Sequence, residues 1–305
     1  MFVKYVFIVL LPVCFGLYIE QSFSDDDLGQ TPKVSETEAV VDEAQDVEIV
    51  ENNDAKTISG GLSQADVASR SFWLNYFGIF YGPSVTHPSG YQPTPSGEKD
   101  LFNPIILKNY LSLGYEFSEK LSISGTAYWL WRPVMGQQFI MRDPYIRLGL
   151  DQIIHTGGWN LYADARVHFP VTLASRDNDL LAAFQSFQVL TFQVANLTIG
   201  TYNSIRYNYF GKQGFGNDLE LYLGPNLYFR MRDNLSLTLL YEVLVSHAFG
   251  ERPFVFSNDG TNLSPGVAWD VTPNFYLNPY INFFPSSNFS LRSASLGMIV
   301  SVKML

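Results

Sequence analysis

Few residues of this chain could carry acid–base or nucleophilic chemistry. The 305-residue sequence has four histidines and one cysteine, Cys14. Ser246 and His247 are adjacent, but neighbouring side chains of a strand point to opposite faces, so these two cannot pair as nucleophile and base. The sequence contains no Gly-rich phosphate loop and no metal-spaced cluster of histidine, cysteine and acidic residues. We therefore expect no enzymatic activity, no cofactor and no metal site.

Charged residues recur at every second position of long alternating runs. In residues 159–169, Asp164, Arg166 and His168 alternate with alanine and valine. A period of two is typical of a β-strand whose two faces meet different surroundings. Parity places on the polar faces of such strands Lys108, Glu116, Arg132, Arg147, Asp151, Asp164, Arg166, His168, Arg206, Glu220, Arg230, Glu242, Asp270 and Lys303.

Twelve segments show this alternation and predict an all-β fold. Globular strands average about five or six residues, whereas a strand tilted through a bilayer needs roughly nine to eleven. The segments are of the longer kind, which favours a membrane protein over the alternative, a secreted β-sandwich. The predicted strands span residues 70–82, 104–116, 121–132, 143–153, 158–170, 181–194, 197–210, 218–230, 235–247, 262–271, 274–284 and 291–304.

The connections between the predicted strands alternate between short and long. Aromatic residues on the apolar faces also gather near both strand ends, as expected for side chains at the two interfaces of a bilayer. The short links lie at 117–120, 154–157, 195–196, 232–234 and 272–273, and the longer ones at 83–103, 133–142, 171–180, 211–217, 248–261 and 285–290. The aromatic residues are Tyr115, Trp159, Phe229, Trp269 and Phe275 near the short links, and Trp129, Trp131, Phe169, Tyr207, Tyr209 and Phe283 near the long ones.

The first residues predict an export signal. Lys4 precedes an apolar run that is shorter than a spanning helix requires. Small residues predict cleavage after Ser24, which makes residues 1–24 a signal peptide, with Gly16 as the second choice. An uncleaved anchor and a lipid-modified Cys14 are the alternatives.

An acidic segment follows the signal. Residues 20–67 hold 13 of the 29 acidic residues of the chain. A segment with this charge and few aromatics buries too little surface to offset the entropy of ordering, so residues 25–68 are expected to be a disordered tail. A short helix over residues 36–50 is the alternative. Residues 69–305 carry equal numbers of acidic and basic residues, which excludes the basic face that nucleic-acid binding needs.

Residues 69–305 resemble the Gram-negative outer-membrane β-barrels. The resemblance rests on the export signal, the alternation, the asymmetry of the connections and the last predicted strand. Members usually end in an aromatic residue, whereas this chain ends in Leu305. The resemblance implies a closed antiparallel transmembrane β-barrel of about twelve strands, inserted by the barrel-insertion machinery among outer-membrane lipids. It also implies a channel, a receptor or a structural barrel, with membrane-embedded hydrolases as a minority.

The expected function is passive passage of small hydrophilic solutes or ions through a narrow mixed-charge lumen. Arg147, Asp164, Arg166 and Glu242 are expected to line its constriction, because they come from three strands at similar depth. The other polar-face charges are further lumen candidates. The alternative is a plugged structural or receptor barrel whose long loops, above all residues 248–262, bind a partner. An even strand count returns both chain ends to one side, so the tail is expected in the periplasm.

Two pairings can be predicted from the turns. A turn over residues 154–157 would place Arg147 opposite Asp164, and Asp151 opposite Asn160. A second turn, Ala195-Asn196, would send Gln188 and Asn203 to the outer face at mid-strand. Either a bulge shifts the register there, or a polar pair faces lipid or another protomer.

Overall fold

The computed structural model describes residues 71–94, 96–134, 138–285 and 289–305. The predicted signal peptide, residues 1–24, and the predicted acidic tail, residues 25–68, lie outside the described residues. So does the alternative helix over residues 36–50. Within the described part of the chain, no helix is long and apolar enough to cross a membrane.

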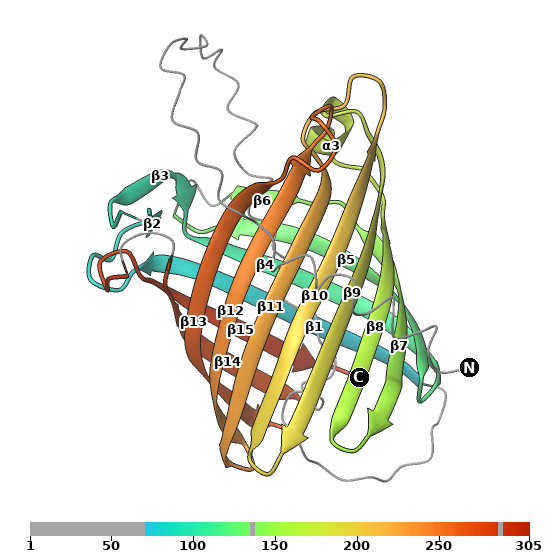
Figure 1. Cartoon of the computed structure of the whole chain (residues 1–305), viewed down its shortest axis with the longest axis vertical. Helices are drawn as coiled ribbons and strands as arrows, with labels where there is room; N and C mark the ends of the chain where they lie inside the picture. Colours follow the sequence, from blue (N-terminus) through green and yellow to red (C-terminus); the bar gives the residue numbers. More distant parts are fainter. Residues whose placement is uncertain (1–70, 95, 135–137, 286–288) are drawn as a thin grey trace. The chain divides into compact units, whose positions relative to one another are not determined.

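The described residues form a closed antiparallel β-barrel of twelve strands (Figure 1). Each strand pairs with its sequence neighbour in the wall, and the ring closes because β1 pairs with both β4 and β15. The predicted all-β barrel is therefore confirmed. The wall strands are β1 (Ser71–Ser84), β4 (Ile106–Ser118), β5 (Leu121–Arg132), β7 (Tyr145–Thr156), β8 (Trp159–His168), β9 (Leu180–Val194), β10 (Leu197–Phe210), β11 (Asn217–Arg232), β12 (Leu235–Ala248), β13 (Ser257–Thr272), β14 (Phe275–Asn282) and β15 (Ser295–Lys303).

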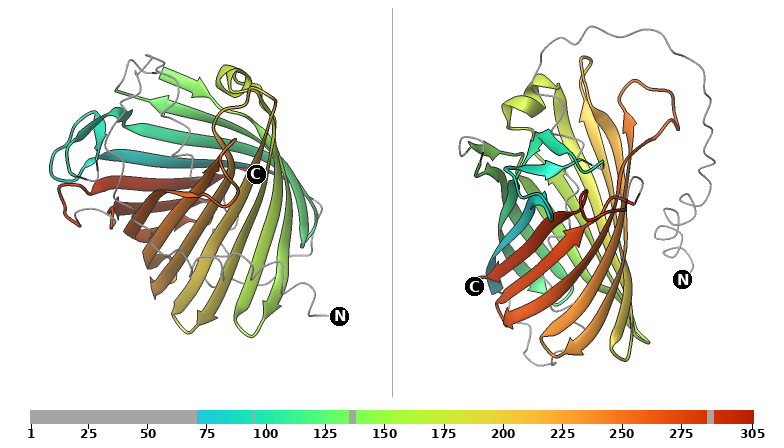
Figure 2. Two further views of the ribbon diagram at one scale, coloured as in Figure 1. Left: turned by 45° about the horizontal axis from the view of Figure 1, so that its top comes forward. Right: turned by 90° about the vertical axis from the view of Figure 1, so that its left-hand side faces the viewer.

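The long connections all emerge at one end of the barrel, and the short turns lie at the other (Figures 1 and 2). The connection from β1 to β4 carries a small two-stranded sheet, β2 (Tyr91–Pro93) and β3 (Lys99–Pro104). β6 (Gln138–Met141) prolongs the β5 hairpin, and the short helix α3 (Leu173–Asp177) lies between β8 and β9. The predicted alternation of connections is confirmed.

The two faces of the wall differ in polarity as the alternation predicts. On β5 the inward Ser122, Ser124 and Thr126 are buried, while the outward Ile123 is exposed. Exposed apolar side chains cover the outer face of most wall strands, whereas many inward polar side chains are inaccessible to solvent. Such an exterior is stable only where it contacts hydrocarbon instead of water. The chain is therefore a barrel of the transmembrane type.

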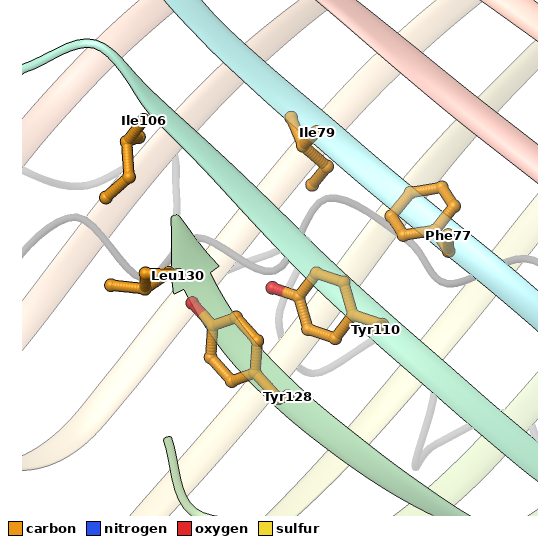
Figure 3. Packing of buried hydrophobic residues seen from close by; sticks show 6 residues of the cluster. All are labelled: Phe77, Ile79, Ile106, Tyr110, Tyr128 and Leu130. Carbon is orange, nitrogen blue, oxygen red and sulfur yellow. The ribbon is translucent and has the colours of Figure 1, made fainter. Parts of the chain in front are cut away.

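One part of the inner face is apolar and packed. The cluster comes from β1, β4 and β5, and its two tyrosine rings stack with centroids 4.3 Å apart. Figure 3 shows these side chains lying together along neighbouring strands. The members of the cluster are Phe77, Ile79, Ile106, Tyr110, Tyr128 and Leu130.

Two inward glycines let aromatic rings lie flat against the wall. Trp73 is paired with Gly114, and a Cβ at Gly114 would lie 2.1 Å from the Trp73 ring. Tyr280 is paired with Gly297, where a Cβ would likewise lie 2.1 Å from the tyrosine ring. Both rings therefore occupy the space that a side chain on the next strand would fill.

The predicted partners of Arg147 and Asp151 are wrong. The β7–β8 turn is the two-residue Gly157-Gly158, with φ of 58° and 85°, and not the four-residue turn expected from the sequence. A bulge between Leu150 and Ile154 then moves the register back by two residues. Arg147 consequently lies opposite Arg166, Asp164 lies opposite Gly149, and Asn160 lies opposite His155. Because the shift is even, Arg147 still faces inward.

The backbone conformation of Gly158 provides a test of the β7–β8 turn. A Cβ at Gly158 would lie 2.6 Å from the carbonyl oxygen of Gln193, and its φ of 85° is strained for any L-residue. Gly158→Ala should lower the free energy of unfolding by about 1–2 kcal/mol. The measurement is the urea dependence of the compact band that a folded barrel gives on an unboiled detergent gel.

Gly157→Asn is the matched control for this turn. The φ of 58° at Gly157 suits asparagine, and a Cβ there meets no atom within 4 Å. Its unfolding curve should stay close to that of the unchanged protein. Equal losses for Gly157→Asn and Gly158→Ala would contradict the turn geometry.

Candidate functional site

A charged cluster lies on the inner face of β7 and β8, and we call Arg147, Tyr162, Asp164 and Arg166 the β8 charge cluster. Tyr162, Asp164 and Arg166 are alternate residues of one strand, so their side chains share a face. Nε and Nη2 of Arg166 donate to the two carboxylate oxygens of Asp164 at 2.8 and 3.1 Å. The Tyr162 hydroxyl donates to the same carboxylate at 2.8 Å. The Asp164 carboxylate thereby accepts three hydrogen bonds, two from Arg166 and one from Tyr162.

The two arginines of the cluster are held by aromatic rings. The Arg166 guanidinium lies between Tyr145 and Phe187, 5.4 and 5.1 Å from the ring centroids. The Arg147 guanidinium lies 5.5 Å from the Trp73 ring of β1, and its Nε donates to Ser124 of β5 at 3.1 Å. Cation–π contacts of this kind are worth about 0.5–2 kcal/mol, more where the cation is desolvated. The contacts of Arg147 therefore bridge three strands of the wall.

The β8 charge cluster has an excess of positive charge. Arg147 and Arg166 are directly opposed in register, an arrangement that destabilises a strand pair through repulsion. The Asp164 carboxylate and the aromatic contacts offset this repulsion. An inward surface with two fixed cations and one carboxylate presents a positive potential to the lumen.

Glu242, the fourth predicted constriction residue, makes its contacts elsewhere. On β12 its carboxylate accepts hydrogen bonds from the Tyr222 hydroxyl, at 2.8 Å, and from Asn262. Lys108 of β4 attracts the same carboxylate electrostatically. β4 and β12 are five strands apart around a ring of twelve, so this attraction acts across the lumen. We call Lys108 and Glu242 the cross-lumen pair.

Lys108 also contacts an aromatic ring of the neighbouring strand. Its ammonium lies 5.2 Å from the centroid of the Tyr81 ring on β1. Parity predicts that Lys108 and Glu242 both face inward. Their attraction across the lumen could not be predicted from the sequence, because it depends on closure and on strand tilt.

A small polar cavity lies toward the long-loop end, below α3. Its volume is about 50 Å³, enough for a few water molecules. The predicted lumen residues His168, Arg206 and Glu220 line it together with Asn208. Arg206 and Glu220 are linked through Asn208, which accepts from Arg206 at 3.0 Å and donates to Glu220 at 3.1 Å. The His168 ring bonds to Gln185 at 2.9 Å.

The remaining lumen candidates lie outside these groups. All of them occur on the predicted strands, and they differ in exposure. The half-buried ones are Arg132, Asp151, Arg230 and Asp270, and the exposed ones are Glu116 and Lys303.

Ser246 and His247 do not pair in the structure. Ser246 is buried and bonds to Ser257 at 3.0 Å. The His247 ring bonds through Nδ1 to the Asp218 carboxylate at 2.6 Å and through Nε2 to the Arg252 carbonyl at 3.0 Å. Two acceptors occupy both nitrogens, which leaves no ring lone pair to act as a general base. This arrangement anchors the β12–β13 loop. Absence of enzymatic activity stays a prediction.

Metal binding was not expected from the sequence. Among the described residues, no group of three or more histidine, cysteine, aspartate or glutamate side chains is arranged to hold a metal ion. Absence of a cofactor or metal stays a prediction for the whole chain.

Comparison with known proteins identifies no family. No protein-family model and no curated protein matches the chain. Among solved structures, the chain is similar to OmpT, an outer membrane protein of Vibrio cholerae. A loop L8 deletion mutant of OmpT is 9% identical with a TM-score of 0.39, and the in-vitro folded trimer form is 8% identical with a TM-score of 0.37. Each match covers 78% of this chain and 100% of the other.

Identity and TM-score this low carry no information on the activity of this chain. The predicted resemblance to outer-membrane β-barrels is confirmed at the level of the fold class, because the described residues close into a twelve-strand antiparallel barrel. No specific family within that class is assigned.

The β8 charge cluster generates a prediction about stability. Asp164→Asn would leave Arg166, which is 2% exposed, without its carboxylate. Breaking a buried ion pair from one side should lower the free energy of unfolding by about 3 kcal/mol. Urea unfolding of the purified barrel, followed by the compact band on an unboiled gel, measures the change.

The exposed ion pair Arg292–Glu98 serves as the control. Its atoms are 3.4 Å apart and both side chains are more than half exposed. Glu98→Gln should change the free energy of unfolding by no more than about 1 kcal/mol. Similar effects of Glu98→Gln and Asp164→Asn would mean that Asp164 is not a buried partner of Arg166.

Proposed function

We propose that the chain is an outer-membrane barrel through which small hydrophilic solutes or ions pass passively. The observation that carries the proposal is the concentration of charged side chains on the inner face, in the β8 charge cluster and the cross-lumen pair. In this proposal the long loops face the outside of a Gram-negative cell. The short turns, and with them the acidic residues 25–68, face the periplasm.

The energetics of buried charge support a lumen that handles polar solutes. Desolvating a carboxylate or a guanidinium is costly, and well-packed apolar residues often replace buried ion pairs with equal or greater stability. Ionisable residues within a membrane protein are therefore candidates for a solute or ion path. Arg147, Arg166 and Glu242 are all 5% exposed or less, so the barrel retains them at a cost.

The dimensions of the barrel limit the size of the solute. Twelve strands roughly 4.8 Å apart and tilted by about 40° close at a backbone radius of roughly 12 Å. Side chains reach inward from both walls, and Lys108 and Glu242 interact across the space that remains. The bore is therefore expected to be narrow, with Lys108 and Glu242 among the side chains that border it.

The charges of the two groups nearly balance. The cross-lumen pair contributes one charge of each sign, and the β8 charge cluster contributes two bases and one acid. Rings of fixed charge set the ion preference of a pore. With one excess positive charge, the proposed channel should favour anions weakly.

The second candidate function is a plugged structural or receptor barrel. It is supported by the low exposure of the inward charges, since Asp164, Arg147 and Arg166 are all 3% exposed or less. The β12–β13 connection could then bind a partner through its exposed aromatics, among which Phe254 is 83% exposed. Conductance distinguishes the two candidates.

The channel proposal predicts opposite effects from the two members of the cross-lumen pair. Lys108→Met should shift the reversal potential in a salt gradient toward cations, and Glu242→Gln should shift it toward anions. Arg147→Ala should act in the same direction as Lys108→Met, because it leaves Asp164 less neutralised. Each variant is measured as purified, folded protein in a planar bilayer.

Tyr241→Phe is the control, because Tyr241 neighbours Glu242 on β12 but faces outward. It should leave conductance and reversal potential unchanged. If the folded wild-type protein and the lumen variants all give no current steps, the interior is a closed polar plug and the second candidate function holds.

A further inference from the structure

One histidine ties the β12–β13 loop, residues 249–256, to the wall of the barrel. His247 is the second-last residue of β12, and its ring is bonded at both nitrogens. Nδ1 lies 2.6 Å from Oδ1 of Asp218 on β11, and Nε2 lies 3.0 Å from the carbonyl oxygen of Arg252 within the loop. We call this ring with its two acceptors the His247 anchor.

Both partners of the ring only accept hydrogen bonds. An ionised carboxylate and a backbone carbonyl carry lone pairs but no proton to donate. A neutral imidazole has one N–H group and donates to only one of them, whereas the imidazolium ion has two N–H groups and donates to both. The geometry at His247 is therefore that of the protonated ring.

The His247 anchor lies at the edge of the membrane-spanning part of the wall. β12 has 14 residues, more than the roughly nine to eleven that a bilayer requires. His247 is paired with Leu219, which is paired in turn with Tyr207, one of the aromatic residues near the long loops. The ring therefore lies at the outer interface, where protons of the surrounding water reach it.

The charged groups around the ring favour its protonated form. The bonds to the Asp218 carboxylate and to the Arg252 carbonyl raise the pKa of His247 above its ordinary value of 6.5. Glu251, the one acidic residue of the loop, attracts the ring as well. On β13, Asp259 is bonded to a serine of its own strand. The one basic residue of the loop is Arg252, which supplies only its carbonyl to the anchor.

The loop that the anchor holds also contacts the rim of the polar cavity below α3. The Phe249 ring packs against Phe210 of β10, with centroids 5.3 Å apart, and the Phe249 N–H donates to the Gly216 carbonyl at 2.8 Å. Phe210 lines the cavity. The position of the loop is therefore coupled to one wall of this cavity, at the long-loop end of the barrel (Figure 1).

The anchored loop has a strained backbone. Phe254 has a φ of 69°, a left-handed conformation that is an outlier for a bulky residue. Its side chain is 83% exposed, so burial of the ring does not offset the strain. The Val255 N–H donates to the Arg252 carbonyl at 3.2 Å, and this is the carbonyl to which His247 also donates. Loss of the histidine bond therefore removes part of what holds the strained turn in place.

We propose that the His247 anchor is a pH-sensitive device that holds the β12–β13 loop on the barrel while the ring is protonated and releases it when the ring is neutral. At acidic pH both bonds form. As the pH rises through the raised pKa of His247, the ring loses one N–H group and keeps one bond. The carboxylate of Asp218 is the stronger acceptor, so the bond to the Arg252 carbonyl is the one lost. The device acts on the loop alone, whether or not the lumen conducts.

A spin label in the loop tests the proposal on the purified full-length chain in detergent. The label is attached to Val255→Cys in a Cys14→Ser background, because Val255 is 51% exposed. Its mobility, measured by electron paramagnetic resonance from pH 5 to pH 9, should increase with a midpoint above pH 6.5. Asp218→Asn should lower this midpoint by about one pH unit, which corresponds to a tenfold weaker affinity for the proton.

Three controls separate the anchor from other effects of pH. His247→Gln should abolish the transition, and His87→Gln should leave it unchanged, because His87 bonds to Thr86 in another loop. A label on Leu173→Cys, in the connection between β8 and β9, should show no change with pH. The compact band on an unboiled gel confirms folding of each variant at both ends of the pH range. A constant mobility at position 255, a transition that persists in His247→Gln, or an equal transition at position 173 would overturn the proposal.

Discussion

Closure of the sheet is the constraint on which the rest of the structure depends. In hydrocarbon no water is available to bond an open strand edge, so every backbone donor and acceptor in the wall must find a partner in the chain. β1 and β15, at the two ends of the described chain, supply each other's missing edge through a register that includes the pair Ile79–Ile299. Their antiparallel pairing requires an even number of wall strands. It therefore also puts the start of β1 and the end of β15 at the same end of the barrel.

Two neighbouring parts of the inner face are different environments. The strands β1, β4 and β5 contribute the stacked Tyr110 and Tyr128 and an aliphatic cluster, so this part of the wall behaves like a soluble protein core. The strands β7 and β8 contribute the bidentate Arg166–Asp164 pair. Arg147 joins the two environments by reaching from β7 to the Trp73 ring. The Arg147 guanidinium is thus oriented by an aromatic ring on β1.

Much of the fold could be predicted from the sequence, because alternation acts locally and needs no knowledge of partners. The expected strand 121–132 coincides with β5, and 197–210 coincides with β10. The site could be predicted less well. The bulge at Gln152, with φ of 51°, leaves no signal in the alternation because it shifts the register by an even number of residues. The attraction between Lys108 and Glu242 depends on how the four intervening strands curve, and no local pattern encodes that curvature.

The rings that lie over Gly114 and Gly297 have a consequence for how the width of the lumen could change. Trp73 and Tyr280 are among the largest inward side chains, yet each occupies the place of a missing neighbour and lies along the wall. A methyl group at either glycine would displace the ring toward the barrel axis, and at Gly114 it would also move the surface on which the Arg147 guanidinium rests. The width of the interior therefore depends partly on two glycines, which have no side chain. A substitution at such a position would change the width of the interior without changing a single charged residue.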